Sequence, residues 1–304
     1  MNKPCVYVGD PLSPRVYERL ARKMRIVDNY DHPEELDAII IRRALCPRSV
    51  LEKAKKLKLI SMHGTGTDTI DMEAARGLGI PVITHPGYNS QSVAELALSH
   101  ILALERRLLT IDQGMREGRY HTFGDSYGGE HELFGKKAGV IGTGAVAQKF
   151  AAIMRGGFSC HVLAFNAHHT AREIQAMCFI PVMDLKELFR VCDYICVCPK
   201  LTAETKYMVN ADVLSQANPD LILTNVSRGG VVNEKDLYEA LVSHKIRGAA
   251  SDVFETEPPR ADDPILALDN FIGTFHNGGS TVEAMEKLGN ATVDDIFRVL
   301  GIQE

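Results

Sequence analysis

The sequence has 304 residues, of which 45% are hydrophobic and 24% charged, and its 34 Lys and Arg against 39 Asp and Glu give a net charge of -5. This is the balance of an ordinary globular protein, long enough for two domains with substantial cores. The mild acidity provides no basic surface for nucleic acid or an anionic membrane, and no apolar run reaches membrane-spanning length. The first residues contain no apolar signal core, so we expect a cytoplasmic protein.

Short apolar runs alternate with amphipathic stretches along most of the chain. The runs expected to form strands are 5–9, 38–43, 58–64, 81–85, 138–142, 161–165, 193–198, 220–227 and 247–254. The stretches expected to form helices are 49–57, 71–79, 145–154 and 234–245. Strands that alternate with helices predict parallel sheets covered on both faces, and their number predicts two doubly wound α/β domains.

Two longer helical patterns suggest how the domains are connected. The first covers residues 89–115, and Ser92 with Glu95 three residues later predicts a capping box at its start. The second covers residues 281–301 and has no strand after it, so we expect it to return to the first domain.

Seven cysteines, an odd number, argue against a closed disulfide framework and favour a reducing compartment. The cluster Cys192, Cys196 and Cys198 lacks C-x-x-C spacing and a second ligand pair, so we predict no metal site. Cys196 and Cys198 lie two residues apart in an expected strand, and we interpret them as small apolar side chains on one strand face.

A glycine-rich turn, Gly142-Thr-Gly144-Ala-Val-Ala147, links an expected strand to an expected helix. In a dinucleotide-binding turn the first glycine permits the tight bend, the second lets the backbone approach the pyrophosphate, and a small third residue allows close packing. The phosphates would then meet free amides at the helix N-terminus. The expected cofactor contacts here are Gly142, Thr143, Gly144, Ala145 and Val146. The alternative is a tight turn in an α/β domain without a cofactor.

Six longer motifs occur in a characteristic order over most of the chain. They are "GTGTDTIDMEAARGLGIPVITHPGYNSQSVAE", "FGKKAGVIGTGAVAQKFA", "LTAETKYMVN", "ILTNVSRGGVVNEKDLYEAL", "ASDVFETEP" and "FHNGGST". With them the sequence resembles the D-isomer-specific 2-hydroxyacid dehydrogenases, although its first 60 or so residues are less distinctive. The resemblance implies two Rossmann-like domains, with a dinucleotide-binding domain (94–277) inserted into a substrate-binding domain (1–93 and 278–304). It also implies an interdomain active site, a small 2-oxoacid or 2-hydroxyacid substrate, NAD or NADP as cofactor, and a homodimer.

The resemblance assigns three catalytic residues. Arg228, in "NVSRGG", would grip the 2-oxoacid with its planar guanidinium group and stabilise charge on the reacting oxygen. His276, in "FHNGGST", would give a proton to the substrate oxygen during reduction and remove it during oxidation. Glu257, in "DVFETEP", would pair with His276, because a carboxylate stabilises the imidazolium and orients the ring.

Further binding residues also follow from the resemblance. Asp252 would accept a hydrogen bond from the nicotinamide carboxamide, and Asn89 would lie near the substrate. The backbone amides of Gly64, Thr65 and Gly66 would bind the substrate carboxylate. The remaining expected contacts are Cys198, Val226, Ser227, His276 and Gly278 for the cofactor and His63 for the substrate. His63, His85, Tyr88 and the segment 121–129 are candidates for enclosing the substrate side chain, whose identity stays open.

The cofactor choice depends on Asn166, which stands where an acidic residue normally accepts hydrogen bonds from the adenosine ribose. In the family this residue is usually Asp in enzymes that prefer NAD, and its charge also repels the 2′-phosphate of NADP. Asn166 removes that repulsion, and His168 or His169 would bind the phosphate, so we predict tolerance of NADP. In the alternative interpretation both histidines are solvated turn residues, and Ala167 stands where NADP-preferring relatives often have Arg.

A second function shares this fold. A corepressor-like branch binds nicotinamide cofactors and recognises protein partners, so the alternative is a sensor with little turnover. Formate dehydrogenases, another branch, generally carry an amide at the position of Glu257, and the acid here argues against that activity.

Overall fold

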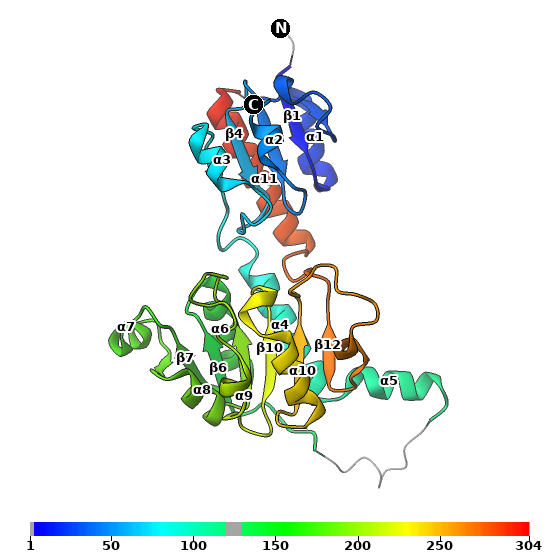
Figure 1. Ribbon diagram of the computed structural model, residues 1–304, viewed down its shortest axis with the longest axis vertical. Coiled ribbons are helices and arrows are strands. Elements are labelled where there is room, and N and C mark those ends of the chain that lie inside the picture. Colours follow the sequence, from blue (N-terminus) through cyan, green and yellow to red (C-terminus); the bar gives the residue numbers. More distant parts are fainter. Residues whose placement is uncertain (1–2, 120–128, 304) are drawn as a thin grey trace. The chain divides into compact units, whose positions relative to one another are not determined.

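The computed structural model describes residues 3–119 and 129–303, and the chain divides into two compact units (Figure 1). Unit 1 contains Met1–Ser90 and Gly279–Glu304, and unit 2 contains Gln91–Gly278. In sequence, unit 2 is therefore an insertion within unit 1. Among the described residues, no helix is both long and apolar enough to cross a membrane.

Unit 1 is built on a five-stranded parallel sheet. Across the sheet its strands are β2 (Arg25–Val27), β1 (Cys5–Val8), β3 (Ala38–Ile41), β4 (Leu59–Met62) and β5 (Val82–Ile83). Its helices are α1 (Pro14–Lys23), α2 (Arg48–Leu51), α3 (Met72–Gly77) and α11 (Val282–Leu300). Both faces of the sheet are buried, because Ile39 and Ile41 of β3 join one hydrophobic cluster while Ala38 and Ile40 join another.

Helix α11 completes one face of unit 1, as its amphipathic pattern suggests. It begins after Thr281, whose side chain accepts a hydrogen bond from the Ala284 amide, and it ends at Gly301 in the left-handed region. Its apolar side chains share a core with β1, β3 and α1; the buried members of this core include Val6, Val16, Leu20, Val293, Ile296 and Phe297. The last helix of the chain is thus part of the same core as the first strand.

Unit 2 is built on a seven-stranded parallel sheet. Across the sheet its strands are β12 (Phe271–Gly273), β11 (Gly248–Ser251), β10 (Ile222–Asn225), β9 (Tyr194–Val197), β6 (Lys137–Ile141), β7 (His161–Phe165) and β8 (Ile180–Pro181). Its helices are α4 (Ser90–Glu105), α5 (Leu108–Arg116), α6 (Ala145–Phe158), α7 (Ala171–Ala176), α8 (Leu185–Val191), α9 (Ala211–Leu214) and α10 (Glu234–Val242). The two parallel sheets with flanking helices confirm the doubly wound α/β class.

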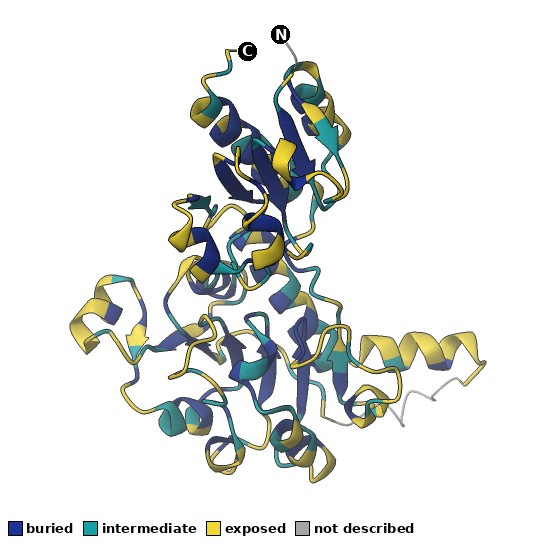
Figure 2. Ribbon diagram, turned by 45° about the horizontal axis from the view of Figure 1, so that its top comes forward, coloured by how far each residue is buried: buried dark blue, intermediate teal, exposed yellow. Residues whose placement is uncertain are grey.

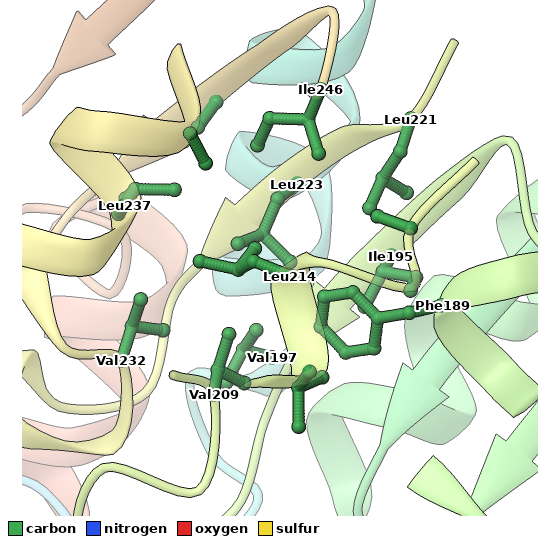
Figure 3. Close-up of a cluster of buried hydrophobic side chains, with 14 of the residues drawn as sticks. Phe189, Ile195, Val197, Val209, Leu214, Leu221, Leu223, Val232, Leu237 and Ile246 are labelled. Atoms are coloured by element: carbon green, nitrogen blue, oxygen red, sulfur yellow. The ribbon is translucent and has the colours of Figure 1, made fainter. Parts of the chain in front are cut away.

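The strands of unit 2 are also buried on both faces. Ile195 and Val197 of β9 belong to the large cluster on one face, drawn in Figure 3. Tyr194 and Cys196 belong to the cluster on the other face, and Cys198 packs against that second cluster. The interpretation of Cys196 and Cys198 as apolar side chains on one strand face is therefore correct.

In each sheet, successive strands of the chain are placed first to one side and then to the other, so the strand order reverses once. Ligands of open parallel sheets bind at the carboxyl ends of the strands beside such a reversal. In unit 1 the reversal lies between β1 and β3. There Asp10 Oδ2 accepts hydrogen bonds from the backbone amides of Arg42, Arg43 and Ala44, at 2.6, 2.9 and 3.1 Å. The protein's own carboxylate thus takes the place of an anionic ligand in unit 1. In unit 2 the reversal lies between β6 and β9.

The expected helix over 49–57 is wrong beyond its first turn. Helix α2 ends at Leu51, and the following residues form turns in which Lys53 N donates to Val50 O and Leu57 N donates to Ala54 O. Ala54 and Leu57 are buried in the core of unit 1. Packing of these two side chains therefore outweighs the helical propensity of the lysine-rich segment.

The long helix expected over 89–115 is two helices, because Arg107 has φ 49° between α4 and α5. Glu105 ends α4 as a fully buried carboxylate that is 3.0 Å from Arg247 and accepts a hydrogen bond from the Tyr194 hydroxyl at 3.2 Å. The expected capping box is also wrong: α4 begins at Ser90, so Ser92 lies inside the helix.

Candidate active site

The glycine-rich turn lies at the carboxyl end of β6, beside the reversal of strand order in unit 2. Gly142 has φ 86°, and a Cβ atom there would be 3.4 Å from the Pro199 amide nitrogen, so a glycine fits this tight turn. Gly144 precedes α6 without a side-chain cap, and a Cβ atom at Gly144 would find no heavy atom within 4 Å. A ligand can therefore approach the backbone at Gly144, at the uncapped start of this 14-residue helix, which suits a pyrophosphate.

The loop after β10 carries Arg228 and is organised by Asn225. The Asn225 side-chain oxygen accepts hydrogen bonds from the Ser227 amide at 3.1 Å and the Ser227 hydroxyl at 2.8 Å. Its amide nitrogen donates to Arg228 O at 3.0 Å. The Arg228 guanidinium in turn donates to Ser227 O at 2.8 Å. These bonds hold the backbone at Arg228 in one conformation.

The Arg228 loop packs directly on the loop after β11. A Cβ atom at Gly229 would lie 2.0 Å from the Phe254 carbonyl carbon and 2.3 Å from the Glu255 nitrogen. Real Cβ atoms do not approach backbone this closely, so only glycine lets the two loops touch. The contact places the backbone next to Arg228 against the segment that leads to Glu257.

His276 and Glu257 form a hydrogen-bonded pair. The distance from His276 Nδ1 to Glu257 Oε2 is 2.8 Å, and both side chains are a little over one-third exposed, at 39% and 37%. The other carboxylate oxygen, Oε1, accepts the Phe254 amide at 3.1 Å. Because the carboxylate accepts at Nδ1, the acid-base role expected of His276 would use Nε2.

The environment keeps Glu257 ionised. Burial alone would raise its pKa, but the hydrogen bond and charge of His276, the Phe254 amide and the charge of Arg228 together lower the pKa below its ordinary value. An ionised Glu257 can stabilise a positive charge on His276, as an acid-base residue requires.

Asp252 anchors the loop that carries His276. Its Oδ1 accepts the Asn277 amide at 2.9 Å and the Thr274 hydroxyl at 2.7 Å, and its Oδ2 accepts the Gly278 amide at 2.9 Å. Its backbone oxygen accepts the His276 amide at 2.7 Å. His276 has φ 52°, a left-handed conformation that costs a non-glycine residue on the order of 1–2 kcal/mol. The bonds to Asp252 hold it there.

In unit 1, His85 holds the loop of Gly64, Thr65 and Gly66. The His85 amide donates to Gly64 O at 2.8 Å, and the Thr65 hydroxyl donates to His85 O at 3.4 Å. The His85 ring is 2.7 Å from Met62 O through Nδ1 and 2.9 Å from Asp295 Oδ2 through Nε2. A Cβ atom at Gly64 would find no heavy atom within 4 Å, so a ligand can approach the backbone there.

The other two residues expected near the substrate are held within unit 1. His63 is fully buried, its Nε2 lies 3.2 Å from Met285 O, and burial lowers its pKa. Asn89 packs on the backbone of Gly279, where a Cβ atom would be 2.5 Å from Asn89 Nδ2. Of the expected segment 121–129, residues 121–128 lie outside the described residues.

In unit 2, the expected residues gather at the carboxyl ends of successive strands of one sheet. They follow β6 (Gly142, Thr143, Gly144, Ala145, Val146), β7 (Asn166, His168), β9 (Cys198), β10 (Val226, Ser227, Arg228), β11 (Asp252, Glu257) and β12 (His276, Gly278). This is the edge at which a doubly wound sheet binds its ligand.

A family model agrees with this geometry. The model for "D-isomer specific 2-hydroxyacid dehydrogenase, NAD binding domain" matches residues 98–278, more than half of the chain and nearly all of unit 2. The chain belongs to this family. The resemblance noted in the sequence is thereby confirmed, and with it the class of the enzyme, an oxidoreductase with an NAD-binding Rossmann domain.

Two curated relatives illustrate the range of the dehydrogenase family. A hydroxypyruvate reductase of Thermotoga maritima is 33% identical over 98% of this chain and 98% of its own length. A D-3-phosphoglycerate dehydrogenase of Methanocaldococcus jannaschii is 37% identical over 88% of this chain but only 50% of its own length. The chain thus spans about half the length of the phosphoglycerate dehydrogenase and nearly all of the reductase.

A solved structure gives the same fold. The NADPH-dependent glyoxylate/hydroxypyruvate reductase of Sinorhizobium meliloti, solved in complex with NADP and malonate, has a TM-score of 0.83 and 26% identity. The similarity covers 96% of this dehydrogenase and 92% of that chain.

The surroundings of Asn166 bear on the cofactor question. Asn166 Nδ2 donates to the Thr143 hydroxyl at 2.9 Å, and its Oδ1 accepts the His168 amide at 2.9 Å. His169 Nδ1 lies 3.1 Å from the same hydroxyl. His168 Nε2 lies 3.3 Å from Glu204 Oε2, and both of these side chains are exposed. A carboxylate therefore stands beside one of the two histidines expected to meet a 2′-phosphate.

Sequence reasoning missed several residues that hold this site of the dehydrogenase together. Asn225, Thr274 and Glu204 are close to the expected residues in the chain, but polar loop residues are common and carry no distinctive signal. His100 and Asp295 lie within helices and act through contacts with residues distant in sequence. Only the contacts of the folded chain identify such residues.

Proposed function

We propose that this protein interconverts a 2-oxoacid and the corresponding D-2-hydroxyacid. The observation that carries the proposal is the pair of His276 Nδ1 and Glu257 Oε2 at 2.8 Å, with Glu257 on the loop that packs against the one carrying Arg228. The matched relatives support it, because their names are those of dehydrogenases and reductases of small hydroxy- and oxoacids. Those names lend no support to the alternative of a sensor with little turnover.

The cofactor is NAD or NADP, and when bound it supplies or accepts the hydride. The amides at the start of α6, with Gly142, Thr143, Gly144, Ala145 and Val146, would hold its pyrophosphate. Asn166 and His168 would meet the adenosine ribose, Cys198, Val226 and Ser227 would line the site, and Asp252 with Gly278 would meet the nicotinamide.

The acid-base step belongs to His276. With Nδ1 bound to Glu257, Nε2 gives a proton to the substrate oxygen in reduction and removes it in oxidation. The Arg228 guanidinium binds the carboxylate and the carbonyl oxygen of the substrate, and it stabilises the negative charge that develops on that oxygen. We further expect the amides of Gly64, Thr65 and Gly66 to bind the substrate carboxylate, and His63 and Asn89 to contact the substrate.

The cofactor specificity we propose is tolerance of NADP. Asn166 lacks the negative charge that would repel a 2′-phosphate, and the reductase of Sinorhizobium meliloti shows that a protein of this fold binds NADP. Glu204 limits the preference, because its carboxylate competes for His168.

The assembly we propose is a homodimer formed through α5, in the cytoplasm. Helix α5 extends away from the body of unit 2 and is largely exposed (Figures 1 and 2). Leu108, Leu109, Ile111 and Met115 expose between 45% and 60% of their surfaces. An apolar helix face of this kind is typical of a protein interface. All seven cysteines are free, which suits a reducing compartment.

The activity is tested by measuring oxidation of NADH and NADPH with a panel of 2-oxoacids that includes glyoxylate, hydroxypyruvate and phenylpyruvate. We expect turnover of at least one of them by the parent protein and a loss of about 10²- to 10⁴-fold in His276→Ala. Cofactor affinity, followed by nucleotide fluorescence, should remain. Absence of turnover with every oxoacid, despite tight cofactor binding, would favour the sensor function instead.

A further inference from the structure

His100 is a buried titratable side chain that the acid-base step does not use. It lies on α4, is 97% buried and has both ring nitrogens near hydroxyl groups. Nδ1 is 3.1 Å from Thr224 Oγ1, on β10, and Nε2 is 3.3 Å from Thr274 Oγ1, directly after β12. The ring therefore connects a helix with the ends of two strands whose following loops carry Arg228 and His276.

Asp252 determines the direction of each hydrogen bond in the series that links Thr224, His100, Thr274 and Asp252. Both of its carboxylate oxygens accept backbone amides, so the Thr274 hydroxyl must donate its only proton to Asp252 Oδ1. Thr274 Oγ1 can then only accept from His100, which requires a proton on Nε2. A neutral ring protonated at Nε2 accepts at Nδ1, and the Thr224 hydroxyl supplies that proton.

The neutral form of the ring fits its surroundings. Burial lowers the pKa of His100 to about 4, although the charge of Asp252 opposes the change. All three hydrogen bonds thus have the same direction: Thr224 donates to His100, His100 donates to Thr274, and Thr274 donates to Asp252. Successive bonds of this kind polarise and strengthen one another in a buried environment.

Asp252, the last acceptor in this series of hydrogen bonds, also holds the loop that carries His276. Asp252 binds the Asn277 and Gly278 amides through its carboxylate and the His276 amide through its backbone oxygen. His276 needs these bonds because its backbone is left-handed. Without its Thr274 partner, the carboxylate would keep only the Asn277 and Gly278 amides to fix its orientation.

We propose that His100 is a positioning residue, which acts through Thr274 and Asp252 to fix the His276 loop in its reactive conformation. The inference rests on the proposed acid-base function of His276. The structural part of it, the protonation of His100 at Nε2, is independent of any activity.

The first experiment is nitrogen-15 NMR of the histidine side chains in the full-length protein at neutral pH, with His100→Leu identifying the His100 signals. We expect the pattern of a neutral ring with Nε2 protonated and Nδ1 bare. Protonation at Nδ1, or at both nitrogens, would overturn the proposal whether or not the protein turns over an oxoacid.

The second experiment compares four proteins: the parent, His100→Leu, His100→Gln and Ile101→Val. Ile101 is the next residue of α4 and is fully buried, so Ile101→Val is a matched packing control. In His100→Leu we expect kcat to fall on the order of tenfold or more, with little change in the KM for the oxoacid. The His276 resonances should also shift. His100→Gln, whose amide can donate to Thr274, should recover much of kcat.

Two results contradict the proposal. One is a folded His100→Leu protein with the parent's kcat, pH profile and His276 resonances. The other is an equal loss of kcat in Ile101→Val, which would show that general packing of α4 is responsible. If no variant and no parent turns over any oxoacid, the proposed function fails, and the His276 resonances still decide whether His100 positions the loop.

Discussion

Gly229 touches the backbone of Phe254 so closely that a Cβ atom would stand 2.0 Å from its carbonyl carbon. Gly229→Ala must therefore separate the loop of Arg228 from the loop of Glu257. We expect a loss of unfolding free energy of about 3 kcal/mol or more, since backbone cannot yield as a side chain does. Turnover should fall with it. Thermal unfolding and steady-state kinetics measure the two effects.

The neighbouring glycine is the control for this prediction. A Cβ atom at Gly230 would lie 3.5 Å from the Leu201 methyl groups, an ordinary contact. Gly230→Ala should keep a stability close to that of the parent. Equal stability of the two variants would mean that the loops are not packed as described.

We expect the pair of Glu257 and His276 to support the rate of reduction. A lowered pKa keeps Glu257 ionised around neutral pH, and its negative charge stabilises the protonated ring that donates to the substrate. In Glu257→Gln, the reduction rate at neutral pH should fall by about tenfold or more, because the ring loses the carboxylate that stabilises its protonated form. Steady-state rates at pH 7 test this. An unchanged rate would show that the carboxylate does not act on His276.

Glu234 is a carboxyl group whose deprotonation lowers the stability of the folded protein as the pH rises. Burial raises its pKa from 4.5 to about 7, with the charges of Glu255, Asp263 and Glu257 adding to the effect and the Glu255 amide opposing it. Below pH 4.5 the group is protonated in both states. Between pH 4.5 and 7 the unfolded chain releases the proton more readily, so stability falls.

Glu234→Gln removes this titration. The Tm of Glu234→Gln minus the Tm of the parent should therefore increase from pH 5 to pH 8. Glu239→Gln, at an exposed position of the same helix, should show a Tm difference that varies little with pH. A constant difference for Glu234→Gln would contradict the raised pKa.

We expect Asn166 and Glu204 to control the response to the 2′-phosphate. Asn166→Asp places a negative charge beside it and should weaken NADPH binding relative to NADH on the order of tenfold. Glu204→Gln frees His168 and should strengthen NADPH binding. Fluorescence titrations with both nucleotides measure the ratio. Asn29→Asp, an exposed change of equal charge in unit 1, should leave the ratio as it was.

The exposed face of α5 is the proposed dimer contact. Leu109→Glu introduces a charge at a side chain that is 60% exposed, which should cost the monomer little and weaken the dimer. Light scattering after size-exclusion chromatography gives the mass. Leu45→Glu, at an exposed leucine of unit 1, is the control. A Leu109→Glu protein that stays dimeric would place the interface elsewhere.

The strong elements of the fold could be predicted from the sequence because their apolar runs are long and buried on both faces. All nine expected strands are present. The three that were missed, β2, β8 and β12, have two or three residues each, and each lies at the edge of its sheet. A segment this short gives only a weak periodic pattern, although β5, with two residues at another sheet edge, lies within the expected run 81–85. The break between α4 and α5 depends on the burial of Glu105, which needs Arg247 from a distant part of the chain.

The residues of the candidate site also fall into two groups, those that could be predicted from the sequence and those that could not. The expected residues were found through motifs with special backbone needs, such as the turn at Gly142, or through the family resemblance. The groups that hold them have no motif. Thr274 contacts both His100 and Asp252, and these contacts form only in the folded chain.

Unit 1 is formed by two segments that unit 2 separates in the sequence, and this has a consequence for the way the protein folds during synthesis. Val16 and Leu20 bury their side chains against α11, which follows the whole of unit 2 in the sequence. The ribosome therefore completes the continuous unit 2 before it releases the helix that finishes unit 1, and closing so long a loop is slow. Until then the side chains of Val16 and Leu20 lack the partners that α11 provides. Limited proteolysis of unit 1 in stalled nascent chains, compared with the released protein, would show whether unit 1 is completed only after release.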